Sequence, residues 1–358
     1  MATETPAARR RKNIRPSKER KAGPKKNAQP KSGTDFLLNL DKLQSEHKDK
    51  FRSPHKNWRQ LVKEGQLAEM VLTPGSFISD KEIRNRKLQN TYYPDPDAIT
   101  TTIDRDTLFW SPGKKEIEGI YLKQRIPKEL QDLAFEGLEE MEWTPPRTRR
   151  ETIPAIERQE RIGGVPAGEL LFGHTARGSI EKTLDSRSMW KQFMKLGKLL
   201  GEMNSIFSRT IPTYYSKQNH ILSLEKRVKE RQERTGRKPG TEFGGTPDEL
   251  RIPLSVFTTI TLLRNCPAAI HKDNNARKDQ SSFSCLTTVG ENFTGGTFCL
   301  LEPGLRIPVK PGDVLIAQTT KMWHCNLTPV QGKKYSVVAY SFKEIANPVL
   351  TEKWRKKQ

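Results

Sequence analysis

The chain has 358 residues, a formal net charge of +21 and a hydrophobic content of 34%. This length allows about two domains, or one domain with extensions, and the low hydrophobic content predicts that part of the chain lies outside a packed core. The positive charge favours a polyanionic partner such as nucleic acid, although basic tails on an ordinary domain would give the same total. No apolar run is long enough to span a membrane or to form a signal-peptide core, so we expect neither membrane insertion nor secretion.

The four cysteines all lie in the last third of the chain, at Cys266, Cys285, Cys299 and Cys325. None of them forms a CxxC pair. A reduced, intracellular protein is the natural interpretation.

Three segments are dominated by charge. Residues 1–33 include Arg9-Arg10-Arg11-Lys12 and almost nothing apolar, so we expect a disordered tail that serves as a nuclear import signal, a phosphate-binding arm or only a solubilising extension. Residues 225–250 read as a charged insert, either a nucleic-acid contact or a solvated surface. Residues 346–358 read as a basic C-terminal tail.

Residues 34–160 have a mixed composition and are predicted to be an N-terminal extension of unknown role. Helical spacing of apolar residues covers Lys128–Met141, and a shorter helix is expected near Trp58. No catalytic constellation occurs in this region. Farther along, Ser186–Arg209 carries an apolar stripe at three- and four-residue spacing, which is typical of a helix that packs on a core.

Beyond Leu254 the hydrophobic pattern changes to that of short strands, with a turn expected at Gly290-Glu291-Asn292. Many short strands separated by turns predict a sandwich or a barrel. The predicted strands are Ser255–Leu263, Phe283–Val289, Gly296–Leu301, Gly312–Ala317, Met322–Asn326 and Tyr335–Phe342.

The strand region contains a candidate metal site. His271 and Asp273 are two residues apart, so both can point to the same side of an extended strand, and His324 follows in a later strand. Two imidazoles and one carboxylate are the ligand set of non-haem Fe(II) oxygenases.

Further motifs follow the His-x-Asp pair in a fixed order. The chain carries Gly295-Gly296-x-Phe298, Pro311-Gly312-Asp313, Trp323-His324 and Gly332-Lys333-Lys334-Tyr335-Ser336. This order resembles the double-stranded β-helix of the Fe(II)/2-oxoglutarate dioxygenases.

A narrower resemblance is to the TET/JBP family of nucleic-acid-modifying dioxygenases, and most closely to its fungal members. It covers roughly residues 160–345. The residues that carry it are Asn265, His271-Lys272-Asp273-Asn274-Asn275, Leu286–Gly290, Phe293–Phe298 and Gly332–Tyr340.

The resemblance implies an α+β fold, with a jelly-roll oxygenase domain over residues 161–345 and supporting helices. It implies that His271, Asp273 and His324 hold Fe(II), that 2-oxoglutarate and O2 are co-substrates, and that Lys334 and Ser336 fix the far carboxylate of 2-oxoglutarate. Family members generally have arginine where Lys334 stands. An ammonium can still pair with that carboxylate but lacks the bidentate fork of arginine.

The same resemblance implies oxidation of a methylated base in DNA, chiefly 5-methylcytosine, with N6-methyladenine and thymine as alternatives. Such a base should be flipped out of the duplex to reach the iron. Asn265, Asn275 and His220 are candidates for contacts with the base, and each could equally have a structural role. We expect a nuclear monomer.

Two other functions remain open from the sequence. A prolyl or lysyl hydroxylase would use the same chemistry, and a lysine at the co-substrate position is common in prolyl hydroxylases. A non-catalytic DNA-binding protein could also use the barrel as a scaffold, although the intact ligand set argues against that possibility.

Overall fold

The computed structural model describes residues 56–89, 94–145, 166–173, 190–216, 218, 255–257, 259–273, 283–327 and 329–341. The predictions for residues 1–33, 225–250 and 346–358 fall outside this part of the chain. Within the described part, no helix has the length and apolar character needed to cross a bilayer.

Two sheets form the core of the fold. The larger has the strand order β1-β3-β4-β11-β8-β13-β6-β5, and its strand pairs are antiparallel except for β1 with β3. Its strands are β1 (Ala68–Val71), β3 (Thr107–Trp110), β4 (Ile117–Leu122), β5 (Gly168–Gly173), β6 (Thr259–Arg264), β8 (Ser284–Gly295), β11 (Val314–Ala317) and β13 (Pro329–Tyr340).

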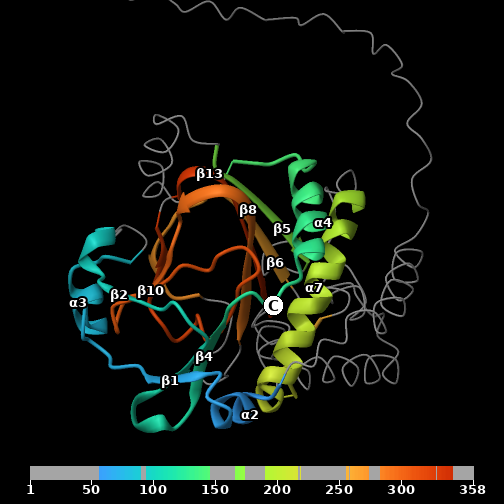
Figure 1. The fold of residues 1–358 in the computed structure, drawn as a ribbon. Helices are drawn as coiled ribbons and strands as arrows, with labels where there is room; N and C mark the ends of the chain where they lie inside the picture. The colour runs from blue at the N-terminus through green and yellow to red at the C-terminus, as the bar shows by residue number, and fades with distance from the viewer. Residues whose placement is uncertain are drawn as a thin grey trace, which may run out of the picture.

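The smaller sheet has the order β2-β10-β9-β12-β7. It consists of β2 (Thr101–Thr102), β7 (Ala268–His271), β9 (Phe298–Leu300), β10 (Leu305–Ile307) and β12 (His324–Asn326). Apolar side chains from both sheets, such as Leu300 and Leu315, pack together between them. The architecture is therefore a jelly roll with supporting helices, and the predicted fold class is confirmed (Figure 1).

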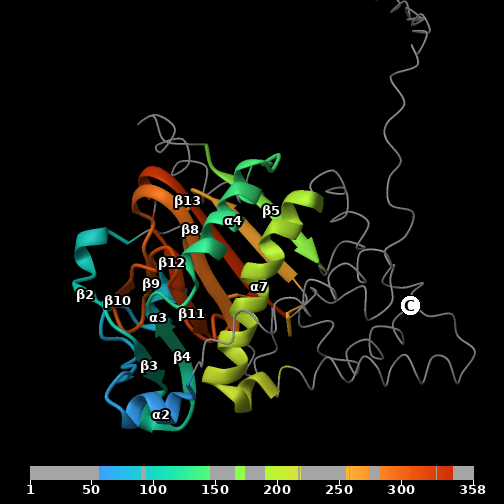
Figure 2. The ribbon, with the colours of Figure 1, turned by 45° about the vertical axis from the view of Figure 1, so that its right-hand side comes forward.

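Helices α4 (Lys128–Glu139) and α7 (Trp190–Thr210) run side by side along the outer face of the larger sheet (Figure 2). Leu138 of α4 and Leu196 of α7 share one core with Val337 and Ala339 of β13. Because side chains alternate along a strand, Lys334, Ser336, Val338 and Tyr340 point to the opposite face, toward the smaller sheet. The helical stripe predicted over Ser186–Arg209 is core packing.

A third apolar core covers the outer face of the smaller sheet. It places Ile83 of α3 (Asp80–Asn85) against Ile270 and Cys325. Ser79 caps α3 by accepting a hydrogen bond from the Glu82 amide at 3.1 Å. The remaining short helices are α2 (Trp58–Lys63), η1 (Pro96–Ala98) and η2 (Pro112–Lys114).

The described part of residues 34–160 is built into both sheets instead of extending from them. β1, β3 and β4 continue the larger sheet beyond β11, and β2 pairs with β10 at the edge of the smaller sheet. These strands contain between two and six residues each, which is too short for a clear alternation of apolar residues to appear in the sequence.

The expected turn at Gly290-Glu291-Asn292 is wrong, because β8 continues through it and stays paired with β13. The register shifts between Gln331 and Lys333, opposite these residues, so an irregularity in the pairing replaces the turn. Gly290 makes the close approach possible: a Cβ at this position would lie 2.1 Å from the Lys333 carbonyl oxygen.

We expect Gly290→Ala to lower the free energy of unfolding by about 3 kcal/mol, because the clash involves backbone that cannot rotate away. Thermal or urea unfolding measures the effect. Gly65→Ala is a matched control, since Gly65 has a φ of 70° but no atom within 4 Å of the added Cβ, and it should cost only about 1 kcal/mol. Equal losses in the two variants would contradict the role of the close approach.

Candidate metal centre and co-substrate pocket

A cavity of about 270 Å³ lies between the two sheets. The larger sheet contributes residues of β6, β8, β11 and β13 to its wall, and the smaller sheet contributes residues of β7, β9 and β12. The polar residues that line it are Thr261, His271, Asp273, Ser284, Thr319, His324, Asn326 and Tyr340. The cavity therefore brings together all three candidate metal ligands.

Two neighbouring strands position the imidazoles. His271 is the last residue of β7, His324 is the first residue of β12, and the two face each other in the antiparallel register. Their ring centroids are 4.2 Å apart. Phe298 of β9 stacks on His324 with a centroid distance of 5.3 Å, which fixes the plane of this ring from the other side.

Asp273 reaches the site by a different route from the one the sequence predicted. β7 ends at His271, so Asp273 lies beyond the strand and not on its face. Its backbone N–H donates to the Thr319 carbonyl at 3.1 Å, which turns the chain back toward the pocket. Its Oδ1 lies 3.4 Å from His271 Nε2 and 3.9 Å from His324 Nε2.

Hydrogen bonds from Nδ1 of each histidine determine that Nε2 is the atom that can bind a metal. His271 Nδ1 lies 2.8 Å from the Ala269 carbonyl oxygen, and His324 Nδ1 lies 3.0 Å from that of Met322. A carbonyl oxygen can only accept, so each Nδ1 carries the proton, and in the neutral ring the lone pair lies on Nε2. Both lone pairs are on the side of Asp273.

The protonation states suit a cation. Burial lowers the pKa of His324 to about 4, so this imidazole is neutral at physiological pH. Burial alone would raise the pKa of Asp273, but the His271 and His324 imidazoles and the Thr319 hydroxyl lower it, and the net pKa lies below its ordinary value. The cluster therefore offers two imidazole nitrogens and one carboxylate oxygen, and these ligand atoms lie within 4.8 Å of one another. This donor set fits Fe(II).

Lys334 and Ser336 lie on the face of β13 that points into the barrel, in line with Val338 and Tyr340 of the pocket wall. Lys334 is 5% exposed, and its ammonium donates to the Gly296 carbonyl. Among the described residues, no carboxylate pairs with this ammonium. Burial lowers the pKa of Lys334 to about 8. A buried cation without a counter-ion is costly, so the site favours an anionic ligand.

Thr288 is a second buried polar residue near this position. It lies directly opposite Ser336 in the pairing of β8 with β13, and it is fully buried. Its hydroxyl has no hydrogen-bond partner in the described part of the chain. The Thr288 hydroxyl, the Ser336 hydroxyl and the Lys334 ammonium lie on one face of adjacent strands, an arrangement that fits the distal carboxylate of 2-oxoglutarate.

The structure describes only one of the three residues predicted to contact the substrate, Asn265. Asn265 lies at the end of β6, 2% exposed, and its side chain holds the backbone: Oδ1 accepts from the Lys334 N–H at 2.7 Å, and Nδ2 donates to the Gly332 carbonyl at 2.9 Å. This gives Asn265 a structural role in placing Lys334. His220 and Asn275 lie outside the described residues.

The sequence did not single out several residues of the pocket. Thr319 hydrogen-bonds to the Ser284 hydroxyl at 2.8 Å and contacts Asp273, and the Tyr340 hydroxyl lies 3.1 Å from that of Thr261. Tyr340 could have been predicted, because it continues the alternation of Lys334, Ser336 and Val338 along one strand. Thr319 could not, because it lies in a loop after β11.

Comparisons with known proteins agree with this geometry. Residues 176–343 match the family model described as Tet_JBP, oxygenase domain of the 2OGFeDO superfamily. No curated protein sequence matches the chain significantly.

Some solved structures are similar to this chain at low identity. The structure of NgTET1 in complex with 5mC DNA is 15% identical with a TM-score of 0.45, covering 72% of this chain and 86% of that one. A prolyl-4-hydroxylase from Pseudomonas putida is 11% identical with a TM-score of 0.31, covering 63% of this chain and 93% of that one. Neither likeness identifies a substrate. The family match and the His-Asp-His cluster agree: residues 176–343 match the Tet_JBP oxygenase domain of the 2OGFeDO superfamily, whose cofactors are Fe(II), 2-oxoglutarate and O2.

Proposed function

We propose that this protein is an Fe(II)/2-oxoglutarate-dependent dioxygenase that oxidises the methyl group of a modified base in DNA, chiefly 5-methylcytosine. The observation that carries the proposal is the pairing of two features in one barrel. The His271, Asp273 and His324 cluster lines the cavity between the sheets. The buried Lys334 ammonium lies on the inner face of the same barrel and has no carboxylate partner among the described residues.

His271, Asp273 and His324 would hold the iron, and Lys334, Ser336 and Thr288 would hold the distal carboxylate of 2-oxoglutarate. The bound iron and 2-oxoglutarate supply the oxidation of an unactivated C–H bond by O2, with release of succinate and CO2. The protein orients these groups: the Ala269 and Met322 carbonyls fix the imidazole tautomers. The apolar walls of Leu286, Phe298 and Leu315 exclude water from the reacting centre.

A base is a reasonable occupant of the remaining space only if it leaves the duplex. His324 is 4% exposed and lines the cavity between the two sheets, so a methyl group in a stacked base pair cannot approach it. A flipped base can enter the barrel mouth. The net charge of +21 supports an attraction to DNA phosphates that is independent of sequence, and the Arg9-Arg10-Arg11-Lys12 run supports a nuclear location for the protein.

Incubation with Fe(II), 2-oxoglutarate and methylated oligonucleotides tests the proposal. We expect the strand that contains 5-methylcytosine to gain the mass of one oxygen atom, and an otherwise identical unmethylated strand to stay unchanged. Oligonucleotides with N6-methyladenine and with thymine, and proline- and lysine-containing peptides, are run in parallel. Oxygen gain in a peptide but in none of the oligonucleotides would overturn the DNA substrate and favour a protein hydroxylase.

DNA binding should also depend steeply on ionic strength if phosphate contacts provide the affinity. Each phosphate that the protein neutralises contributes about −0.9 to the slope of log K against log salt concentration. Fluorescence anisotropy of a labelled duplex between low and physiological salt measures this slope. A slope near zero would contradict a role for the basic residues in binding DNA.

A further inference from the structure

The carboxylate of Asp80, at the start of α3, contacts both chain segments that carry the metal ligands. It accepts a hydrogen bond from Trp323 Nε1 at 2.6 Å, and Lys272 Nζ lies 3.3 Å from the same oxygen. Trp323 directly precedes His324, and Lys272 stands between His271 and Asp273. One side chain, about 190 to 240 residues away in sequence, therefore joins the two ligand-bearing segments.

Other contacts reinforce this junction on the outer face of the smaller sheet. The Lys272 ammonium lies 4.9 Å from the centroid of the Trp323 ring, within cation–π range, and 3.6 Å from a carboxylate oxygen of Glu302. Arg84 fixes Asp80 from within α3 at 2.7 Å. Hydrogen bonds from Arg84 and Trp323 and the charge of Lys272 lower the pKa of Asp80 below its ordinary value, so the carboxylate is ionised at neutral pH.

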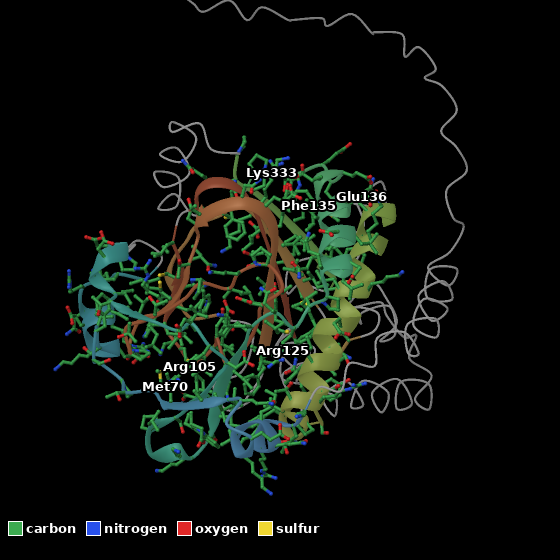
Figure 3. All side chains as sticks on the ribbon, in the orientation of Figure 1. Met70, Arg105, Arg125, Phe135, Glu136 and Lys333 are labelled. Carbon is green, nitrogen blue, oxygen red and sulfur yellow. The ribbon has the colours of Figure 1, made fainter. Side chains whose placement is uncertain are left out.

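Glu139, the last residue of α4, contacts the neighbours of Lys334 in the same way that Asp80 contacts the neighbours of the metal ligands. It accepts hydrogen bonds from Lys333 and from the Tyr335 hydroxyl, the two neighbours of Lys334 in sequence. Tyr335 also lies between Phe135 and Trp143, at centroid distances of 5.8 and 5.3 Å. Figure 3 shows Lys333 beside Phe135 at this end of α4. These contacts fix β13 from its outer face, while the Lys334 side chain points inward.

We infer that Asp80 and Glu139 are positioning residues for the site, Asp80 for the metal ligands and Glu139 for the co-substrate lysine. The inference rests on the function proposed above. Both residues precede segment 176–343, which matches the oxygenase family. The N-terminal region therefore completes the site, although its described residues supply no metal ligand.

A metal ion binds tightly only if its ligand atoms stay at fixed positions relative to one another. Asp273 lies beyond the end of β7, and His324, although paired with His271 and Leu300, is the first residue of β12 and directly follows a loop. A contact that joins the residues next to them limits how far the two ligands can separate. Groups that orient metal ligands typically contribute a factor of roughly 10–100 to metal affinity.

The test measures two affinities in the full chain: that of the metal-free protein for Mn(II), and that of the Mn(II)-saturated protein for 2-oxoglutarate, both by titration calorimetry. We expect Asp80→Asn to weaken Mn(II) binding about tenfold and to leave the 2-oxoglutarate affinity of the saturated protein unchanged. Glu139→Gln should show the reverse pattern. A general loss of structure would change both affinities in both variants, so this crossed pattern distinguishes positioning from destabilisation.

Two matched controls lie on the same helices. Glu82→Gln removes the exposed ion pair of Glu82 with Arg86 on α3, and Glu136→Gln removes that of Glu136 with Lys195 beside Glu139. Neither should change either affinity. Trp323→Phe removes the N–H from which Asp80 accepts a hydrogen bond, together with part of a buried ring. It should weaken Mn(II) binding at least as much as Asp80→Asn does, and adding Asp80→Asn to it should cause no further loss. If Asp80→Asn does not fold, the Mn(II) affinity of Trp323→Phe tests the positioning role of Asp80 instead.

Asp273→Ala separates a failure of this inference from a failure of the proposed function. If the wild-type protein binds Mn(II) no better than Asp273→Ala, the metal site itself is wrong. If the wild-type protein binds Mn(II) and Asp273→Ala does not, while Asp80→Asn and Trp323→Phe bind like the wild type, only the positioning role of Asp80 is overturned. Unchanged 2-oxoglutarate affinity in Glu139→Gln overturns that of Glu139.

Discussion

Replacing Asp273 with alanine is expected to abolish oxidation and to weaken metal binding by more than about 100-fold, beyond the range for groups that only orient ligands. Asp273 is the single anionic member of the cluster, and its oxygen lies between the two imidazoles. Without it, two imidazole nitrogens remain, and these hold a divalent cation weakly. His271→Ala should have a similar effect. Titration of the metal-free variant with Mn(II), and mass spectrometry of a methylated oligonucleotide, measure the two losses.

Asp132→Ala is the matched control for this change. Asp132 is an exposed residue of α4 that forms an ion pair with Lys128, and such pairs contribute less than about 1 kcal/mol. This variant should retain activity and metal affinity. Because the cluster lies at the ends of strands and not in an apolar core, Asp273→Ala should keep a cooperative unfolding transition. Full activity in Asp273→Ala would remove the basis for the metal site.

Lys334→Met is expected to weaken 2-oxoglutarate binding by about 100-fold or more, since truncation of one partner of a buried charge pair costs about 2–5 kcal/mol. In the wild-type protein the affinity should also depend on pH. Burial lowers the pKa of Lys334 to about 8, and only the charged amine pairs with a carboxylate. The affinity should therefore be highest below pH 8 and fall about tenfold per pH unit above it.

Lys334→Arg provides the control for the pH dependence. A guanidinium stays charged throughout this range, so the affinity of this variant should be constant between about pH 7 and pH 9. Calorimetric titration of the Mn(II)-loaded proteins at several pH values gives both profiles. An unchanged affinity in Lys334→Met would show that 2-oxoglutarate binds elsewhere. A wild-type profile as flat as that of Lys334→Arg would contradict the pairing with a titrating lysine.

The sequence predicted the parts of this site that depend on local patterns. The strands of the oxygenase domain follow from runs of β-branched and apolar residues. β6, β8, β9, β11, β12 and β13 all overlap the predicted ranges, although β8 and β13 extend six residues beyond them. The ordered motifs from His271 to Ser336 identified the three residues that meet at the cavity. They also identified Lys334, which is a buried cation on the inward-facing side of β13.

Contacts between distant segments could not be predicted in this way. Nothing near Asp80 in sequence indicates that it lies against Trp323, 243 residues later. Asp273 was expected on a strand, but its amide bonds to the Thr319 carbonyl in a loop, and such a bond depends on how two loops meet. The role of residues 34–160 was missed because β1 to β4 are short and acquire their order from pairing with the rest of the sheets.

Parallel measurement of succinate and of oxidised nucleoside tests the central claim most directly. The wild-type protein is incubated with Fe(II), O2, 2-oxoglutarate and a panel of DNAs that contain 5-methylcytosine, N6-methyladenine or neither, and both products are quantified by mass spectrometry. The proposed function predicts oxidised 5-methylcytosine in amounts that match the succinate formed, and neither product above background with Asp273→Ala. Succinate formation that no methylated DNA stimulates, with no oxidised nucleoside in any sample, would contradict it.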